Sequence, residues 1–138
     1  MSSKSVKTAI NNYLAANWTD TVIVDVENVH VQQPADAAWV GLQWPGSVEY
    51  AAAIGGTCYR EEGTFIINLV GVSGQGTDEL DTFGETMMGL FRGQNIDGVV
   101  IDMVTTPSYR EDEDRQENES GNAYIYLISI DYHYDIYA

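Results

Sequence analysis

The fold is decided by a run near the end of the chain, AYIYLISIDYHYDI at residues 123–136. Apolar or aromatic side chains occupy every second position from Tyr124 to Ile136, which is the two-residue period of a β-strand. The opposite face starts apolar and becomes polar, in the order Ile125, Leu127, Ser129, Asp131, His133 and Asp135. We therefore expect a long strand of which only the first half is buried on both faces.

Two other segments have the spacing of amphipathic helices. Near the N-terminus, Val6, Ile10 and Leu14 recur at i, i+4 and i+8, and Asn17 is expected to end this helix. A second helix is expected at residues 77–91, with Thr77 as its N-cap and acidic residues in its first turn. Its buried face is expected to carry Leu80, Phe83, Gly84, Met87, Leu90 and Phe91.

Further strands are indicated by β-branched and aromatic runs bounded by turn residues. Residues 57–70 are expected to form a β-hairpin whose turn is Glu61-Glu62-Gly63. Trp44-Pro45-Gly46 is expected to be a turn as well. The other expected strands are residues 21–31, in one or two pieces, 38–42, 49–54 and 99–106.

This order of elements predicts the fold class. Strands, a helix and more strands, joined by short turns, favour an α+β fold with two amphipathic helices packed on one face of a mainly antiparallel β-sheet. A chain of 138 residues has the usual size of one domain. We therefore expect a single domain over residues 1–138, with a long acidic loop at about 108–121.

The chain is strongly acidic, with 21 acidic and 6 basic residues and a net charge of −15. Such a field repels nucleic-acid phosphates and anionic membranes, so neither specific nucleic-acid binding nor membrane binding is expected. Residues 1–16 contain no continuous apolar stretch, which argues against a signal peptide or a membrane span. We expect the protein to be made and used in a reducing cytoplasm.

No motif predicts a catalytic, cofactor or metal site. The glycine-rich loop 71–76 lacks the glycine order of phosphate-binding loops, and acidic residues follow it. Asp131 and Asp135 flank His133, but at about 3.3 Å per residue they stand about 13 Å apart, so at most two of the three could join a site completed elsewhere. Cys58 is the only cysteine, which excludes an intramolecular disulfide. We therefore expect no enzyme and no cofactor.

The segment Tyr59–Leu69, with the glycine-bearing loop and the helix that follow it up to Phe91, resembles the central segment of phage tail terminator proteins. In those families an Arg-x-x-Gly turn, here beginning at Arg60, leads to a strand, a glycine-bearing loop and an amphipathic helix. The strand around Trp39 and the ending at residues 128–135 are similar too. The resemblance implies a small α+β subunit that assembles into a hexameric ring and caps the finished tail tube. The other face of that ring meets the head-side connector.

The resemblance also implies partners and a place. The expected partners are other copies of the chain, the tail tube protein and the head-tail connector protein, at the head-proximal end of the tail in a virion assembled in the host cytoplasm. An acidic channel would let DNA pass without holding it, and exposed strand edges are natural subunit contacts. The candidate assembly or channel residues are Arg60, Glu61, Glu62, Glu111, Asp112, Glu113 and Asp114.

Three alternatives remain open. A head-tail connector or a tube subunit would belong to the same structural class as a terminator, and the residues do not separate them. An acidic inhibitor that mimics nucleic acid and binds a basic enzyme would use the run at Glu111–Glu119, which holds six acidic residues. A bound metal at Asp131 or His133 would instead favour an enzyme.

Overall fold

A computed structural model describes residues 3–19, 22–25, 38–52, 58–71, 78–106, 108–112 and 123–137. Several expectations fall outside these residues: the strand beyond residue 25, the loop at 72–76, the N-cap at Thr77 and most of the acidic run after Asp112.

Two helices form where the apolar spacing predicts them. Helix α1 spans Lys4–Asn17, and the Ser3 side chain caps it by accepting a bond from the backbone N–H of Val6. Helix α2 spans Asp78–Phe91, and Gly93 follows it with a φ of 69°, a conformation that glycine adopts without strain. The buried residues are Val6, Ala9, Ile10 and Leu14 in α1 and Leu80, Gly84, Met87 and Phe91 in α2. Both predicted helices are confirmed, although Phe83 and Leu90 of the predicted buried face are only partly buried.

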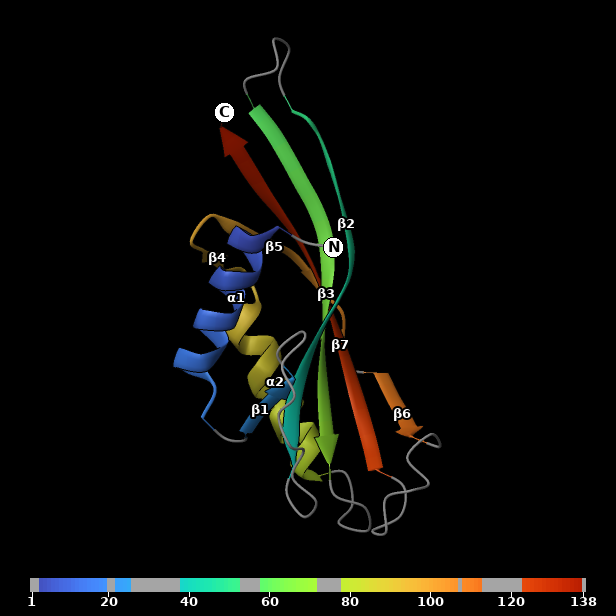
Figure 1. The fold of residues 1–138 in the computed structure, drawn as a ribbon. Helices are drawn as coiled ribbons and strands as arrows, with labels where there is room; N and C mark the ends of the chain where they lie inside the picture. The colour runs from blue at the N-terminus through green and yellow to red at the C-terminus, as the bar shows by residue number, and fades with distance from the viewer. Residues whose placement is uncertain are drawn as a thin grey trace.

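The strands form one mainly antiparallel sheet. Five of them, in the order β2-β3-β7-β5-β4, make a continuous antiparallel run; β1 pairs with β2 in parallel, and β6 pairs with the start of β7. The strands are β1 (Val22–Asp25), β2 (Trp39–Ala51), β3 (Cys58–Gly71), β4 (Asn95–Ile96), β5 (Val99–Val104), β6 (Ser108–Asp112) and β7 (Ala123–Tyr137). Two helices with this sheet confirm the α+β class (Figure 1).

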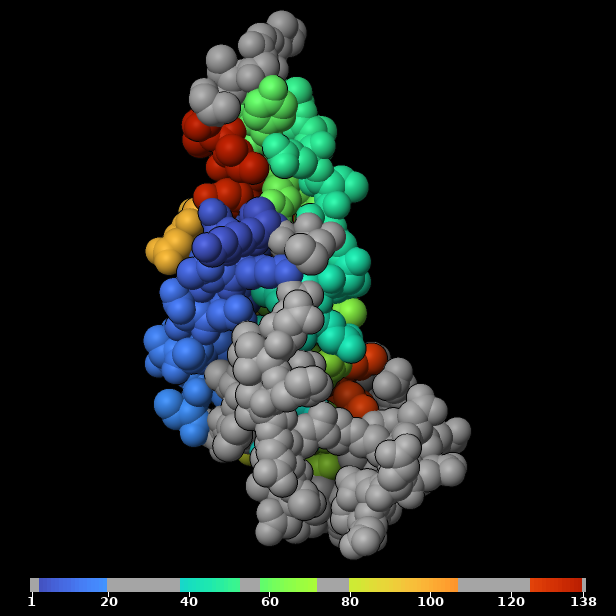
Figure 2. Space-filling model, viewed as in Figure 1, coloured from blue at the N-terminus to red at the C-terminus, as the bar shows by residue number. Residues whose placement is uncertain are grey.

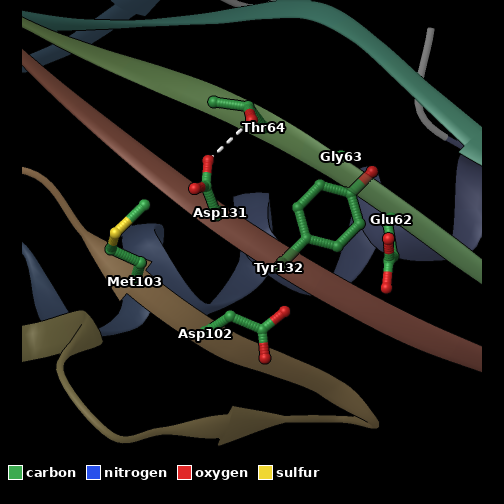
Figure 3. A pocket seen from close by; sticks show the side chains of 7 residues that line it. All are labelled: Glu62, Gly63, Thr64, Asp102, Met103, Asp131 and Tyr132. Carbon is green, nitrogen blue, oxygen red and sulfur yellow. Dashed lines mark hydrogen bonds between the residues drawn. The ribbon is translucent and has the colours of Figure 1, made fainter.

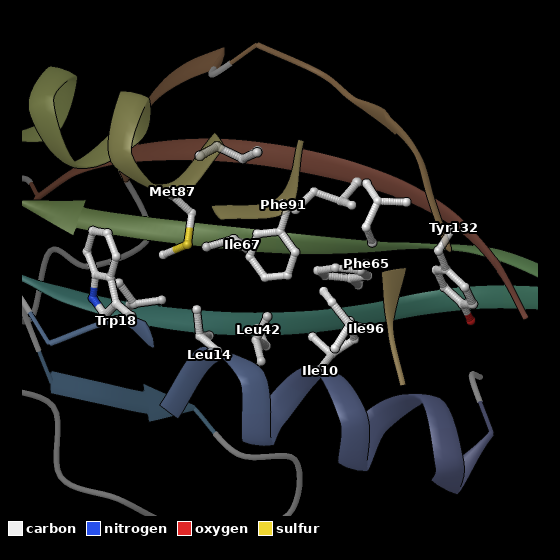
Figure 4. Close-up of a cluster of buried hydrophobic side chains, with 14 of the residues drawn as sticks. Ile10, Leu14, Trp18, Leu42, Phe65, Ile67, Met87, Phe91, Ile96 and Tyr132 are labelled. Atoms are coloured by element: carbon white, nitrogen blue, oxygen red, sulfur yellow. The ribbon is translucent and has the colours of Figure 1, made fainter. Parts of the chain in front are cut away.

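The main core joins buried residues of α1 and α2 with buried residues of the strands, and we call the sheet face that carries these strand residues the core face. On β3 and β7 this face carries Phe65, Ile67, Leu69, Ile128, Ile130 and Tyr132, all nearly inaccessible. Figure 4 shows Leu14 of α1 and Met87 of α2 meeting in the same cluster, and the Tyr13 hydroxyl donates to the carbonyl of Leu90 to link the helices. Burial of this apolar surface is the main source of stability.

Among the residues whose burial is described, those on the opposite face, which we call the outer face, are buried only near the start of β7. There Ile125 packs with Trp39 and Val70 in a second, smaller cluster, and Leu127 lies partly buried against them. Further along β7, the outer-face residues from Ser129 to Asp135 are only partly buried, and Tyr137 is exposed. The prediction that only the first half of this strand is buried on both faces is confirmed.

Two predicted turns are wrong, because both segments lie inside long strands. Glu61-Glu62-Gly63 continues β3, which is paired along its length by β7 on one side and by β2 on most of the other. Trp44-Pro45-Gly46 continues β2, where a register shift between Gln43 and Gly46 accommodates the proline. Proline is tolerated there because no described strand pairs with the other edge of β2 beyond Gly41.

The acidic segment and the region after α2 also differ from expectation. The first part of the predicted loop, Ser108–Asp112, is strand β6, because its backbone pairs with the start of β7. A short hairpin joins β4 to β5 through Asp97 and Gly98, both at positive φ, and the Asn95 side chain accepts a bond from the Gly98 N–H. The expected strand at 99–106 is confirmed as β5.

Candidate assembly surface

Polar side chains occupy every second position along parts of β3 and β7 and therefore share the outer face. The register places Arg60 opposite Asp135, Glu62 opposite His133, and Thr64 opposite Asp131. Directly opposed residues in an antiparallel pair point to the same face and lie close enough to interact. The upper ends of β2, β3 and β7 extend beyond α1, so this part of the outer face stands on a projecting arm of the sheet (Figures 1 and 2).

Arg60 and Asp135 form a two-pronged ion pair across the arm. The Arg60 Nε lies 2.7 Å from Asp135 Oδ1, and a terminal guanidinium nitrogen donates to Oδ2 at 3.0 Å. This fork fixes both side chains, although they remain about one-third and one-quarter exposed. The bond from Arg60 lowers the pKa of Asp135 below its usual value and, reciprocally, raises the pKa of Arg60.

Three further contacts tie neighbouring strands together on this face. The Thr64 hydroxyl donates to Asp131 Oδ1 at 2.7 Å, and His133 Nδ1 lies 2.7 Å from Asp102 Oδ1 on β5. The Tyr50 hydroxyl on β2 donates to Glu62 Oε1 at 2.8 Å, a bond that raises the pKa of Tyr50. Four strands are thus joined by paired side chains.

A bulge in β5 adds a hydrophobic residue to this polar surface. The register shifts between Ile101 and Met103, which lets both Asp102 and Met103 reach the outer face. These two residues, with Glu62, Thr64 and Asp131, line a shallow open depression of about 440 Å³ (Figure 3). The depression therefore has carboxylates on several sides and a thioether at one edge.

Large hydrophobic side chains are exposed on the same face as these polar contacts. Among the described residues, four are prominent: Val48 is 64% exposed, Tyr50 43%, Met103 55% and Tyr137 79%. Their register partners are Glu62, Arg60, Asp131 and Cys58, so all four belong to the outer face. Four large apolar side chains that share one face with a polar surface make this face a candidate for binding another molecule.

The structure separates the candidate residues that the sequence grouped together. Arg60 and Glu62 lie on the outer face, whereas Glu61 lies on the core face and is only 3% exposed. Glu61 Oε2 accepts bonds from the Tyr132 hydroxyl at 2.6 Å and from the Ser3 backbone N–H at 3.3 Å. Glu61 therefore connects the start of α1 to the sheet.

The acidic candidates near β6 are less fully described. Glu111 and Asp112 lie in β6, where their backbones pair with Tyr124 and Ala123. Glu113 and Asp114 fall outside the described residues.

Sequence reasoning missed the contributions of Tyr50, Asp102 and Met103. The place of Tyr50 on this face was not predicted because Pro45 was interpreted as the end of a strand. Val48 and Tyr50 are nonetheless two residues apart, as expected for side chains on one face of a strand. Met103 and Asp102 are adjacent, so simple alternation would place them on opposite faces, and no sequence signal marks the bulge. Within the described ranges, no cluster of three or more His, Cys, Asp or Glu side chains is suited to hold a metal ion.

Comparison with known proteins identifies a family. A family model described as phage tail terminator protein matches residues 5–132, which confirms the resemblance drawn from the sequence. No curated protein matches the chain. One solved structure superposes with a TM-score of 0.52 at 15% identity, over 91% of this chain and 94% of its own, which is a likeness of fold.

Proposed function

We propose, from the premise that the chain belongs to the phage tail terminator protein family, that it forms a ring on the head-proximal end of the tail tube. Membership in this family gives the chain a structural role in tail completion and makes it a component of the virion tail. In the proposed assembly the ring is a hexamer, one face caps the tube, the other meets the head-side connector, and DNA passes through the centre. The family match over residues 5–132 is the observation that carries this proposal.

The sheet offers an edge suited to such a ring. Beyond Gly41, β2 pairs with β3 alone among the described strands, so its other edge, from Gln43 to Ala51, is open to a strand from a neighbour. Contact between this edge and a different surface of the next copy would be head-to-tail, which is the type of contact that closes rings. Both helices lie on the same side of the sheet in Figure 1, and we infer that they cover the core face and leave the outer face for partners.

The charge of the chain agrees with a channel for DNA. A net charge of −15 per subunit repels phosphates and lets a duplex move without being held. No helix in the described part of the chain has the length and apolar character needed to cross a membrane.

We propose no catalytic role for the chain. The family is a structural one, and the polar side chains of the outer face act in the described structure as cross-strand partners. The inhibitor hypothesis depends on residues 111–119, whose side chains are not described, so no structural observation favours it.

The proposal is tested by mixing the purified protein with tail tubes of the same phage. Native mass spectrometry gives the number of copies in the complex, and negative-stain images give its position. Rings on one end of the tubes are expected, with six copies in each. The tubes must be present, because a terminator can remain monomeric until it meets one. Decoration along the tube wall, or no binding at all, would contradict the proposal.

A further inference from the structure

We propose that the outer face of the sheet, from the ends of β2, β3 and β7 across to β5, is a docking surface for a partner protein that presents lysine or arginine side chains beside apolar ones. The surface consists of Val48, Tyr50, Met103 and Tyr137 with the charged residues Arg60, Glu62, Asp102, Asp131 and Asp135. The inference rests on the proposed function for its setting, the joint between tube and head. It assigns this face to a protein contact and not to the lining of the DNA channel.

The exposed apolar side chains supply the reason to expect a protein. Tyrosine, methionine and arginine are enriched in protein interfaces, and here Tyr50, Met103 and Arg60 share one face. A channel for a hydrated polyanion gains nothing from Tyr137 at 79% exposure or Val48 at 64%, whereas a protein partner that covers them removes apolar surface from water.

The bonded polar side chains make this surface rigid before any partner binds. Arg60 donates two hydrogen bonds to Asp135. The hydroxyls of Thr64 and Tyr50 donate to the carboxylates of Asp131 and Glu62, respectively. Binding to side chains that are already fixed loses less conformational entropy than binding to mobile ones. The sheet backbone beneath them adds further rigidity.

The balance of charge selects the kind of partner. The surface has one arginine against four carboxylates, those of Glu62, Asp102, Asp131 and Asp135. Another copy of this chain carries a net charge of −15, and the arginine of its own outer face is already bonded to Asp135. Like charges facing each other are unfavourable, so a basic surface on a different protein is the better complement.

The depression beside Met103 provides a place for a long basic side chain. Its volume is about 440 Å³, and Glu62, Asp102 and Asp131 line it (Figure 3). The alkyl part of a lysine or arginine would pack against the exposed Met103, while its charged end meets the carboxylates. Apolar contact and charge thus act on the same partner residue.

The experiment measures binding of the full chain to two probes: assembled tail tubes and the purified head-tail connector of the same phage. The first variant combines Met103→Ser with Tyr137→Ser, which removes exposed apolar groups that support no described contact in the fold. The second is Glu62→Gln, which removes one charge and keeps an oxygen to accept the Tyr50 bond. Glu85→Ser, at an exposed position of α2, is the control. Urea unfolding checks that each variant is folded.

We expect the double variant to bind one of the probes at least about tenfold more weakly, because it removes two large apolar contacts of the proposed interface. Glu62→Gln is expected to weaken the same binding and to reduce its dependence on salt. Wild-type affinity in both variants would overturn the docking surface while leaving the proposed function intact. Loss of ring formation in the double variant, with binding retained, would assign the face to a second copy and would also overturn it. Failure of the wild-type chain to bind either probe would reject the proposed function and this inference together.

Discussion

Substitution of Gly63 tests whether β3 is continuous through the segment that the sequence predicts as a turn. A Cβ at position 63 would lie 2.7 Å from Ser47 Cβ, 2.8 Å from the Tyr132 hydroxyl and 3.0 Å from the Gly46 carbonyl oxygen. Two of these atoms belong to β2 and move little, so Gly63→Ala forces the strands apart. Overpacking of this kind lowers the free energy of unfolding by about 1–3 kcal/mol.

Gly46 provides a matched control on the adjacent strand. A Cβ there meets nothing within 4 Å, and its φ lies in the ordinary range. Gly46→Ala should therefore raise the free energy of unfolding by about 0.4–1 kcal/mol, because alanine restricts the unfolded chain. The two variants should differ by about 1.4–4 kcal/mol, or by about 5–15 °C in melting temperature for a domain of this size.

Urea unfolding followed by circular dichroism measures both effects. The cross-strand origin of the loss is checked by repeating Gly63→Ala in a Ser47→Gly background, where the nearest atom is absent. The effect of the alanine should be smaller there, since neighbouring substitutions couple. A Gly63→Ala protein as stable as the wild type, or an unchanged loss in the Ser47→Gly background, would refute the packing of β3 against β2 at this point.

Two further predictions concern polar contacts between side chains of β3 and β7. Tyr132→Phe removes the hydroxyl that bonds the buried Glu61 and should lower the free energy of unfolding, measured by urea titration, by about 2 kcal/mol. Tyr137→Phe is the control, because this side chain is 79% exposed, and it should change the free energy of unfolding little. Equal effects of the two substitutions would argue against the buried bond. Because Arg60 lowers the pKa of Asp135, this pair stabilises the fold above the usual carboxylate pKa and the benefit is lost as pH falls through the lowered value. The stability gap between wild type and Asp135→Asn should accordingly close between neutral and strongly acidic pH, and a gap that stays constant or widens in acid would contradict the ion pair.

The regular elements were predictable because their signals are local and repeated. Val6, Ile10 and Leu14 place α1 by spacing alone, and the alternation along β7 gives both the strand and the point where its outer face becomes polar. Such patterns reflect which face must be buried, and the burial of apolar surface is the main driving force of folding.

The predicted turns failed because tertiary pairing overrode local preference. Glu61-Glu62-Gly63 has turn composition, yet β2 and β7 pair with β3 on its two sides, and the glycine is needed because Tyr132 and Ser47 approach closely. Continuing the alternation from Phe65 would have placed Glu61 on the core face. The hairpin at Asp97-Gly98, in contrast, had a recognisable sequence signal that was overlooked.

The candidate surface was predictable only in part. Arg60 and Glu62 were chosen from a resemblance, and the outer-face position of Asp131, His133 and Asp135 followed from alternation. Which strand lies beside β7 depends on long-range topology, and no sequence pattern gives it. The contacts made across β5 therefore required the structure.

The central claim, a ring of this protein at the head-proximal end of the tail, is tested most directly by cryo-electron microscopy of intact virions. A reconstruction of the joint between head and tail should contain density that fits the five-stranded run and two helices described above, in six copies around the tail axis. The outer face of each copy should contact a different protein. Density for this fold along the length of the tube, or its absence from the joint, would contradict the account.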